Sequence, residues 1–308
     1  MSGPTPTAPA PPPVSPRSLA RQRRRQALAR GWGQFRRHRS GLAGLAILAC
    51  FAVLALAAPV LSDADLLEVS KAPGGVLEPP SGEFWLGTDD NGRSVLTLLV
   101  WGSRISLFVG LLATAISIAI GTLVGLASGY FGGWPGRLLY RLTEWFLVIP
   151  YLPLAIVMAS VLGPSLLTIV LVIGATSWPG TTLLIRSQTL SIRERAYLER
   201  AQVLGAGRWH QISRHILPNV MPMVFANTTL TVAVAILSET TLSFLGLGDP
   251  TRVSWGSILN DAFETGAMTT GAWWFIIPPG VCVVLVVLSF TLIGKALEEV
   301  LDPRLAGR

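Results

Sequence analysis

Residues 105–130 read ISLFVGLLATAISIAIGTLVGLASGY, a run of 26 residues without a charged side chain. A helix needs about 20 mostly apolar residues to cross the hydrocarbon core of a membrane. Four further charge-free segments reach that length, at residues 41–61, 163–185, 216–238 and 273–294. A sixth segment, 142–162, carries one acid, Glu144, and a short turn at 162–164 separates it from the next. The sequence therefore predicts an all-α membrane protein with six transmembrane helices.

The composition leads to the same class. Of the 308 residues, 51% are hydrophobic and 13% are charged, and the mean hydropathy is +0.55. A soluble domain carries about 25% charged residues, so most of this surface faces something other than water. The net charge of +7 does not indicate a nucleic-acid partner, because residues 1–61 hold nine arginines and no acid, whereas residues 62–308 hold 15 basic and 17 acidic groups.

The distribution of arginine predicts the orientation, because cytoplasmic loops are rich in Lys and Arg. The 186–215 loop has six arginines against two acids, and the short connection after residue 130 has Arg137 and Arg141. On the opposite side, the 62–103 loop has seven acids against Lys71 and Arg93, and the 245–272 loop has three acids against Arg252. We therefore expect both termini in the cytoplasm and the spans in contact with the lipids of the membrane.

These patterns divide the chain into five parts. Residues 1–40 form a cytoplasmic tail that is first proline-rich and then arginine-rich. In its second part, Leu28, Trp32 and Phe35 have helical spacing, which fits either an amphipathic helix on the inner leaflet or a solvated basic tail. The first span (41–61), an extracytoplasmic loop (62–103), a five-helix core (104–296) and a cytoplasmic tail (297–308) follow.

Small residues recur at four-residue spacing in the second span, at Gly121, Gly125 and Gly129. Small residues on one face allow two helix backbones to approach closely in a membrane. We expect these glycines to pack against another span rather than to bind a ligand.

The residues expected of an enzyme are missing. The sequence has no G-x-x-x-x-G-K-[ST] loop, and its three histidines lie outside the middle of every predicted span. The two cysteines lie in apolar runs and are too few for a disulfide framework or a metal cluster. We expect a membrane protein with no catalytic residue, no metal site and no cofactor of its own.

Two acids lie within or beside the apolar segments, Glu144 and Glu239. Carboxylates inside a membrane often mark ion pathways. Both are close to predicted span ends, where they can reach water or pair with an arginine such as Arg141, and a structural role is favoured. Asn227 in the fifth span is expected to form a hydrogen bond between helices.

The loop at 186–217 contains a good short helix former at 194–204, which stops at Gly205, a residue suited to a helix C-terminus. Pro218 then lies where its fixed φ is tolerated, near the start of the next span. A short exposed helix between two spans gives a soluble partner a rigid element to push on.

This segment resembles the EAA motif of ABC importer permeases, E-A-A-x-x-x-G followed by I-L-P. Glu199, Ala201 and Gly205 match, and the I-L-P at 216–218 begins eleven residues after Gly205. Arg200 stands where the first alanine of the motif usually lies, which adds bulk and charge. By this resemblance the residues that contact the ATPase as a coupling helix are Glu199, Arg200, Ala201, Gln202, Leu204, Gly205, Ala206 and Gly207.

Further segments resemble the C-type subunits of dipeptide and oligopeptide permeases, within the peptide/nickel family. They are residues 84–93 (FWLGTDDNGR), 102–107 (GSRISL), 129–133 (GYFGG), 242–248 (LSFLGLG), 254–256 (SWG) and 301–304 (LDPR). The resemblance covers about residues 30–305. It implies a type I ABC importer permease fold with a cytoplasmic coupling helix, located in the inner membrane of a bacterium.

The resemblance also implies partners. Such a subunit pairs with a B-type permease subunit, with two cytoplasmic ATPase domains that bind ATP and magnesium, and with an extracytoplasmic binding protein. The residues expected to face the binding protein are Asp89, Asp90, Arg93, Asp249 and Trp255. The expected cargo is a di- or oligopeptide, or alternatively a nickel chelate or another small molecule. The alternative to an ABC importer is an ion-coupled secondary transporter that uses Glu144 or Glu239.

Overall fold

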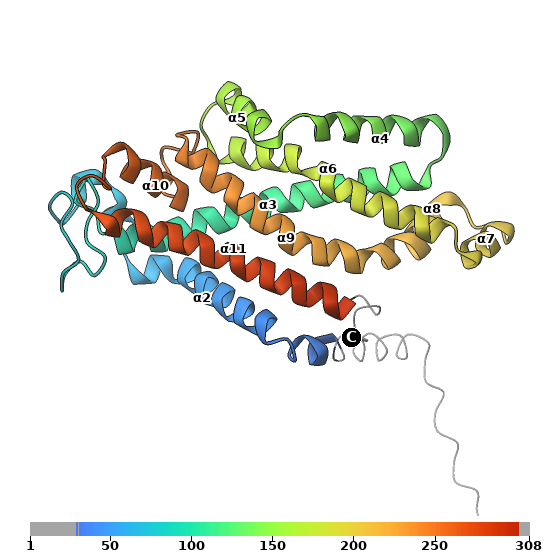
Figure 1. Ribbon diagram of the computed structural model, residues 1–308, viewed down its shortest axis with the longest axis horizontal. Coiled ribbons are helices and arrows are strands. Elements are labelled where there is room, and N and C mark those ends of the chain that lie inside the picture. Colours follow the sequence, from blue (N-terminus) through green and yellow to red (C-terminus); the bar gives the residue numbers. More distant parts are fainter. Residues whose placement is uncertain (1–28, 30, 302–308) are drawn as a thin grey trace, which may run out of the picture.

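The computed structural model describes residue 29 and residues 31–301. Its long helices are α2 (Arg39–Leu61), α3 (Val95–Tyr130), α4 (Gly133–Val148), α5 (Tyr151–Leu162), α6 (Leu166–Arg193), α9 (Leu217–Phe244) and α11 (Trp273–Leu301). Shorter ones are η1 (Ala64–Leu67), η2 (Val69–Lys71), α7 (Ala196–Val203), α8 (Arg208–Gln211), the π-helix η3 (Ile212–Ile216) and α10 (Trp255–Glu264). The predicted all-α class is confirmed for the described residues, and Figure 1 shows an elongated bundle.

Five helices are long and apolar enough to cross a membrane, namely α2, α3, α6, α11 and the continuous helix Arg208–Phe244. The predicted span at 142–162 is not one straight helix, because α4 and α5 meet at an angle of 89°. The break lies at Ile149, which is extended with ψ 125°. Its cause is Pro150, since a proline ring disfavours the helical conformation of the residue before it. The count of spans is therefore five, or six if the bent pair is one span.

Several helices run past the predicted ends of the spans. α3 has 36 residues and begins at Val95, because the charge-free criterion had excluded Arg104, which is an exposed residue of this helix. At about 1.5 Å per residue such a helix exceeds the hydrocarbon core, which is about 30 Å thick, so its first turns can lie outside it. α6 continues through Arg193 and α11 through Leu301.

The N-terminal tail is described only in its last part, where residues 31–35 are helical. Trp32 is exposed and stacks on Phe35 with 5.8 Å between ring centroids. Phe35 is buried and would meet a Cβ added at Gly41. It joins Ile293 of α11 in a small apolar cluster. Leu28 and residues 302–304 lie outside the described residues.

The closest helix pair is α3 with α6, and its contact is a glycine face made of Gly121, Gly125 and Gly129. A Cβ added at each of these glycines would lie 2.6, 2.8 and 2.8 Å from the Cβ atoms of Thr181, Ile185 and Thr189, respectively. Real Cβ atoms do not approach so closely, so no larger residue fits without a shift of one helix. The structure thus places the predicted small-residue face directly against α6.

Hydrogen bonds of polar side chains connect α6 with α3 and with α9. The Thr182 hydroxyl of α6 donates to the Gly121 carbonyl of α3 at 3.2 Å. The Asn227 amide of α9 donates to the Thr181 hydroxyl at 3.0 Å, which confirms the interhelical hydrogen bond expected of Asn227. Together α3, α6 and α9 form the centre of the bundle, with α2 and α11 alongside α9 and α3.

Replacing Gly125 with alanine should destabilise the bundle. The new methyl would lie 2.8 Å from the Ile185 Cβ, and overpacking of this kind costs about 1–3 kcal/mol. Gly180→Ala on α6 is the matched control, because its Cβ would meet no atom within 4 Å. Thermal unfolding of the purified chain in detergent should show a lower Tm for Gly125→Ala and no loss for Gly180→Ala; equal Tm values would contradict the close packing.

Candidate functional site

The exposed connection between α6 and α9 lies at one end of the long axis and carries α7 (Figure 1). The part between the two long helices is shorter than the predicted loop at 186–217. α6 extends through Arg193, and a continuous helix runs from Arg208 to Phe244. The connection proper is therefore residues 194–207, which we call the coupling segment.

α7 ends in a Schellman motif, as the glycine in the sequence suggested. Gly205 has φ 85°, a left-handed conformation that favours glycine. The Ala206 amide donates to the Ala201 carbonyl at 2.9 Å, and the Gly205 amide donates to the Gln202 carbonyl at 3.0 Å. These two bonds satisfy the last carbonyl groups of α7 and turn the chain back toward α8.

Most of the predicted ATPase-contacting residues are exposed. Glu199, Arg200, Gln202, Leu204, Gly205 and Gly207 are exposed, whereas Ala201 and Ala206 are half-buried. Leu204 itself is 86% exposed, and its neighbour Val203 is 87% exposed. Apolar side chains gathered on an exposed turn indicate an interaction surface, so the geometry of the coupling segment suits contact with a soluble partner.

Two residues that sequence reasoning missed fix this segment to the bundle. Leu198 of α7 is 3% exposed and packs with Leu126 of α3 and Ile192 of α6. Gln211 donates from its amide to the Ala206 carbonyl at 2.8 Å and accepts from the Tyr130 hydroxyl at 3.0 Å. Leu198 is the one leucine of α7, but the sequence alone does not distinguish it from the exposed Val203 of the same helix.

A π-helical turn, η3, joins α8 to α9 just before Pro218. Proline has no amide hydrogen and cannot continue the regular α-helical pattern, and single π-turns of this kind accommodate such irregularities. Pro218 lies in the first turn of α9, as expected from the sequence, although α8 and η3 make the helix continuous from Arg208.

At the opposite end of the bundle, the 62–94 loop is organised around one buried carboxylate (Figure 1). Asp89 is 0% exposed. It accepts hydrogen bonds from the amides of Asn91 and Arg93 at 2.9 and 2.7 Å, and from the Arg93 Nε at 2.6 Å. Asp89 was predicted to face a binding protein, but its carboxylate is buried and forms its hydrogen bonds within the loop. Its neighbour Asp90 is half-buried.

Trp255 was also predicted to face a binding protein, and its position is likewise different. It is the first residue of α10 and is 0% exposed. Its indole donates to the Leu99 carbonyl at 3.1 Å, and its amide donates to the Ser106 hydroxyl at 3.2 Å. Trp255 therefore anchors α10 to α3 and cannot meet a partner.

The helix α10 itself was missed within the predicted 245–272 loop. Ser254 caps it by accepting from the Ser257 amide at 3.2 Å, and Ser257 accepts from the Ser254 amide at 3.0 Å. Trp255, Ile258 and Ala262 form its buried face. A serine followed by apolar residues at helical spacing was the signal that could have revealed this helix.

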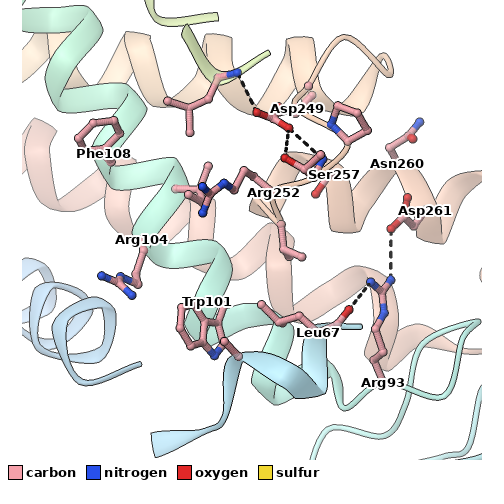
Figure 2. Close-up of a pocket in the computed structure, with 18 of the residues that line it drawn as sticks. Leu67, Arg93, Trp101, Arg104, Phe108, Asp249, Arg252, Ser257, Asn260 and Asp261 are labelled. Carbon is pink, nitrogen blue, oxygen red and sulfur yellow. Dashed lines mark hydrogen bonds and ion pairs between the residues drawn. The ribbon is translucent and has the colours of Figure 1, made fainter. Parts of the chain in front are cut away.

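A cavity of about 960 Å³ opens between α3, the loop before α10, and α10 itself. Figure 2 shows Arg104 and Phe108 on α3 and Arg252 reaching toward that helix from the loop. Arg93 and Asp261 lie on another side of the cavity and form an ion pair at 3.7 Å. The cavity thus combines charged groups of both signs with an aromatic ring.

Asp249 in this loop is half-buried, and its carboxylate holds the loop in place (Figure 2). It accepts from the Thr251 amide at 2.9 Å, from the Thr251 hydroxyl at 2.6 Å and from the Leu166 amide at 3.1 Å. Burial alone would raise the pKa of Asp249, but these hydrogen bonds and the nearby Arg252 outweigh it and keep the pKa below its usual value.

The two acids of the apolar segments have different surroundings. Glu144 pairs with Arg141 at 2.8 Å, as expected. Glu239, however, does not reach water at a span end, because α9 continues through Phe244 and Glu239 is 1% exposed. Its two oxygens accept from the hydroxyls of Ser106 and Ser243 at 3.0 and 2.9 Å.

Two acids at the α10 end are hard to ionise. Burial, followed by the charge of Asp89, raises the pKa of Asp90. Burial also raises the pKa of Asp261 to about 6. The charge of Arg93 lowers this pKa, and the neighbouring acids raise it further. The Asp261 carboxyl therefore changes charge in a mildly acidic range.

Comparison with known proteins agrees with this architecture. Residues 117–307 match the family described as the binding-protein-dependent transport system inner membrane component. The chain belongs to this family. Residues 27–80 also match the N-terminal transmembrane domain of oligopeptide transport permease C. The chain is accordingly a multi-pass protein of the inner membrane.

Individual relatives cover most of its length. The dipeptide transport system permease protein of Bacillus subtilis is 36% identical over 89% of this chain and 85% of its own length. That of Alkalihalophilus pseudofirmus is 36% identical over 88% of each chain. A putative peptide permease protein of Brucella suis is 35% identical over 90% of this chain and 91% of its own.

Replacing Asp89 with alanine should unfold the 62–94 loop. Removing one partner of a buried, hydrogen-bonded ion pair costs about 3–5 kcal/mol. Limited proteolysis should cut Asp89→Ala in this loop at protease concentrations that leave the wild type intact. Lys71→Ala removes an exposed ion pair with Asp65 and should not increase cleavage; if both variants are cut alike, the buried carboxylate does not organise the loop.

Asp261 should make the stability of the chain depend on pH. The unfolded chain loses this proton near pH 3.8 and the folded chain near pH 6, so the contribution of Asp261 is fully favourable below that window and declines as the pH rises through it. Asp261→Asn should therefore gain Tm relative to wild type between pH 4 and pH 7. Glu83→Gln, at an exposed position, is the control, and a pH-independent difference for Asp261→Asn would contradict the raised pKa.

Proposed function

We propose that the chain is one permease subunit of an ABC importer that moves peptides into the cell. The observation that carries this proposal is the exposed coupling segment, in which the EAA-like residues surround a turn closed by Gly205 at φ 85°. Relatives named as dipeptide and peptide permeases at 35–36% identity support a peptide cargo. A nickel chelate or another small cargo is the alternative within the same family.

In this proposal the chain spans the membrane six times, with the bent pair α4–α5 as the third span and both termini in the cytoplasm. The distribution of arginines supports this orientation, since nine precede residue 62 and only Arg93 lies between residues 62 and 103. The partners are a B-type permease subunit, two ATPase domains that bind ATP and magnesium, and an extracytoplasmic binding protein. The chain itself does not hydrolyse ATP.

Coupling would begin where α7 enters a cleft of one ATPase domain. Closure of the ATPase pair displaces α7, and Leu198 transmits this displacement to α3 and α6 through its buried contacts. The hydrogen-bonded path from Ala206 through Gln211 to Tyr130 leads to the end of α3. Because α3 packs tightly on α6 along the glycine face, both helices move together and carry the α10 end with them.

The test is peptide uptake by the complete complex in proteoliposomes, with ATP inside and liganded binding protein outside. The wild-type complex should accumulate di- or oligopeptides only when the ATPase subunits and ATP are present. Uptake by the permease subunits alone, driven by a proton gradient and lost in Glu239→Gln, would replace the proposal with ion-coupled transport.

Proline at Gly205 should uncouple the complex. The proline ring fixes φ near about −65°, which is incompatible with φ 85° at this position. Ala196→Pro is the matched control, because Ala196 is the first residue of α7, where proline is tolerated, and Arg195 before it is already extended with ψ 135°. ATP-driven uptake should fall at least about tenfold in Gly205→Pro, because the turn cannot keep its left-handed conformation, and change little in Ala196→Pro. Wild-type uptake in Gly205→Pro would contradict the role of the coupling segment.

A further inference from the structure

The cavity at the α10 end contains three arginines in unequal situations. Arg93 is neutralised, because its Nε lies 2.6 Å from the Asp89 carboxylate and an Nη lies 3.7 Å from that of Asp261. Arg104 and Arg252 form no ion pair within 4.0 Å anywhere in the described chain. The cavity therefore holds two guanidinium groups whose charge no neighbouring carboxylate contacts.

The surrounding structure orients the Arg104 guanidinium and the loop that carries Arg252, and neither contact uses the N–H donors of the two side chains. The Arg104 guanidinium lies over the Trp101 ring, 5.3 Å from its centroid, an attraction that orients the group and leaves its N–H donors free. Arg252 follows a loop that Asp249 clamps to Thr251 and to the start of α6. The nearest acid on its own loop is thus committed to backbone and hydroxyl donors.

The walls of the cavity are of mixed polarity, and α10 is anchored to α3 beside it. Trp255 pins α10 to α3 through Leu99 and Ser106. Phe108, which is 50% exposed, and Ile105 supply an apolar surface next to Arg104. Figure 2 shows Arg252 extending toward the part of α3 that carries Arg104 and Phe108.

The cavity also continues into the bundle. A small adjoining void is lined by Arg252, Ser257 and the buried Glu239. A volume of about 960 Å³ lies within the range of small-molecule sites, which are concave, mostly apolar and provided with a few oriented polar groups. A concave surface that deepens in this way fits a small ligand better than the convex surface of a protein partner.

We propose that this cavity is a substrate subsite in which Arg104 and Arg252 bind the C-terminal carboxylate of a peptide. Guanidinium groups bind carboxylates through short, charge-assisted hydrogen bonds, and Phe108 and Ile105 contact the adjacent side chain of the peptide. The subsite rests on the proposed function and names the part of the importer that receives cargo from the binding protein. It also accounts for two unpaired arginines on the side of the molecule that is otherwise rich in acids.

The test uses the complete complex in proteoliposomes with saturating liganded binding protein, and compares wild type, Arg104→Gln and Arg252→Gln. The probes are alanyl-alanine and tri- to penta-alanine, whichever of them the wild type accumulates. Two quantities are measured together: peptide uptake, and the stimulation of ATP hydrolysis by the liganded binding protein. Lys71→Gln is the matched control, because Lys71 is an exposed cation of the same end that is already paired with Asp65 and Glu68.

Each arginine variant should reduce uptake by about tenfold or more, as expected when a charge-assisted hydrogen bond is lost, while the stimulation of ATP hydrolysis remains. Arg104→Lys and Arg252→Lys should recover part of the uptake, which a merely misfolded variant would not. Lys71→Gln should behave as wild type.

Two results would overturn the subsite. Unchanged uptake in both glutamine variants would show that the arginines do not bind cargo. A parallel loss of uptake and of stimulated ATP hydrolysis, with no recovery by lysine, would assign the arginines to docking of the binding protein or to folding. A failure of the proposed function itself is distinguishable, because the wild-type complex would then accumulate none of the peptides.

Discussion

The contact between the backbones of α3 and α6 is the constraint on which the rest of this structure depends. In a membrane, association of helices relies on close packing and hydrogen bonds, because lipid tails are as apolar as the side chains they replace. The glycine face of α3 provides that packing against Thr181, Ile185 and Thr189 of α6. Both functional ends of the molecule are built on these two helices, since α3 and α6 hold Leu198 at one end and α3 lines the cavity at the other.

The two ends differ in a way that suits their proposed roles. The coupling segment is exposed and short, and it is attached through the buried Leu198, the hydrogen-bonded Gln211 and the Asn219 amide, which donates to the Tyr197 hydroxyl at 3.4 Å. The α10 end is held by buried polar groups, above all Asp89 and Trp255, which fix a loop and a helix around a preformed cavity. The helices α3 and α6 thus connect the coupling segment, which is proposed to contact the ATPase, with the cavity at the α10 end, which is proposed to bind cargo.

The sequence was sufficient for the class of the fold, for the glycine face and for the turn at Gly205, because each depends on a local and periodic pattern. It was insufficient wherever a tertiary contact determines the burial of a residue or the end of a helix. The charge-free criterion placed the start of the second span after Arg104. The helix α3 in fact begins at Val95, and Arg104 lies over the Trp101 ring. Asp89 and Trp255 looked like surface residues of an acidic loop, and only the fold buries them. The break at Pro150 was visible in the sequence and was overlooked.

The central claim is that α3 and α6 move as one body when the coupling segment is displaced. Double electron–electron resonance between spin labels at the exposed positions Leu123 of α3 and Leu183 of α6 tests it, in a transport-active complex whose native cysteines have been replaced. The distance distribution should be the same in the nucleotide-free and the vanadate-trapped complex. A shift of the distribution by about one helical turn, roughly 5 Å, would show that the helices slide past each other and would contradict the account.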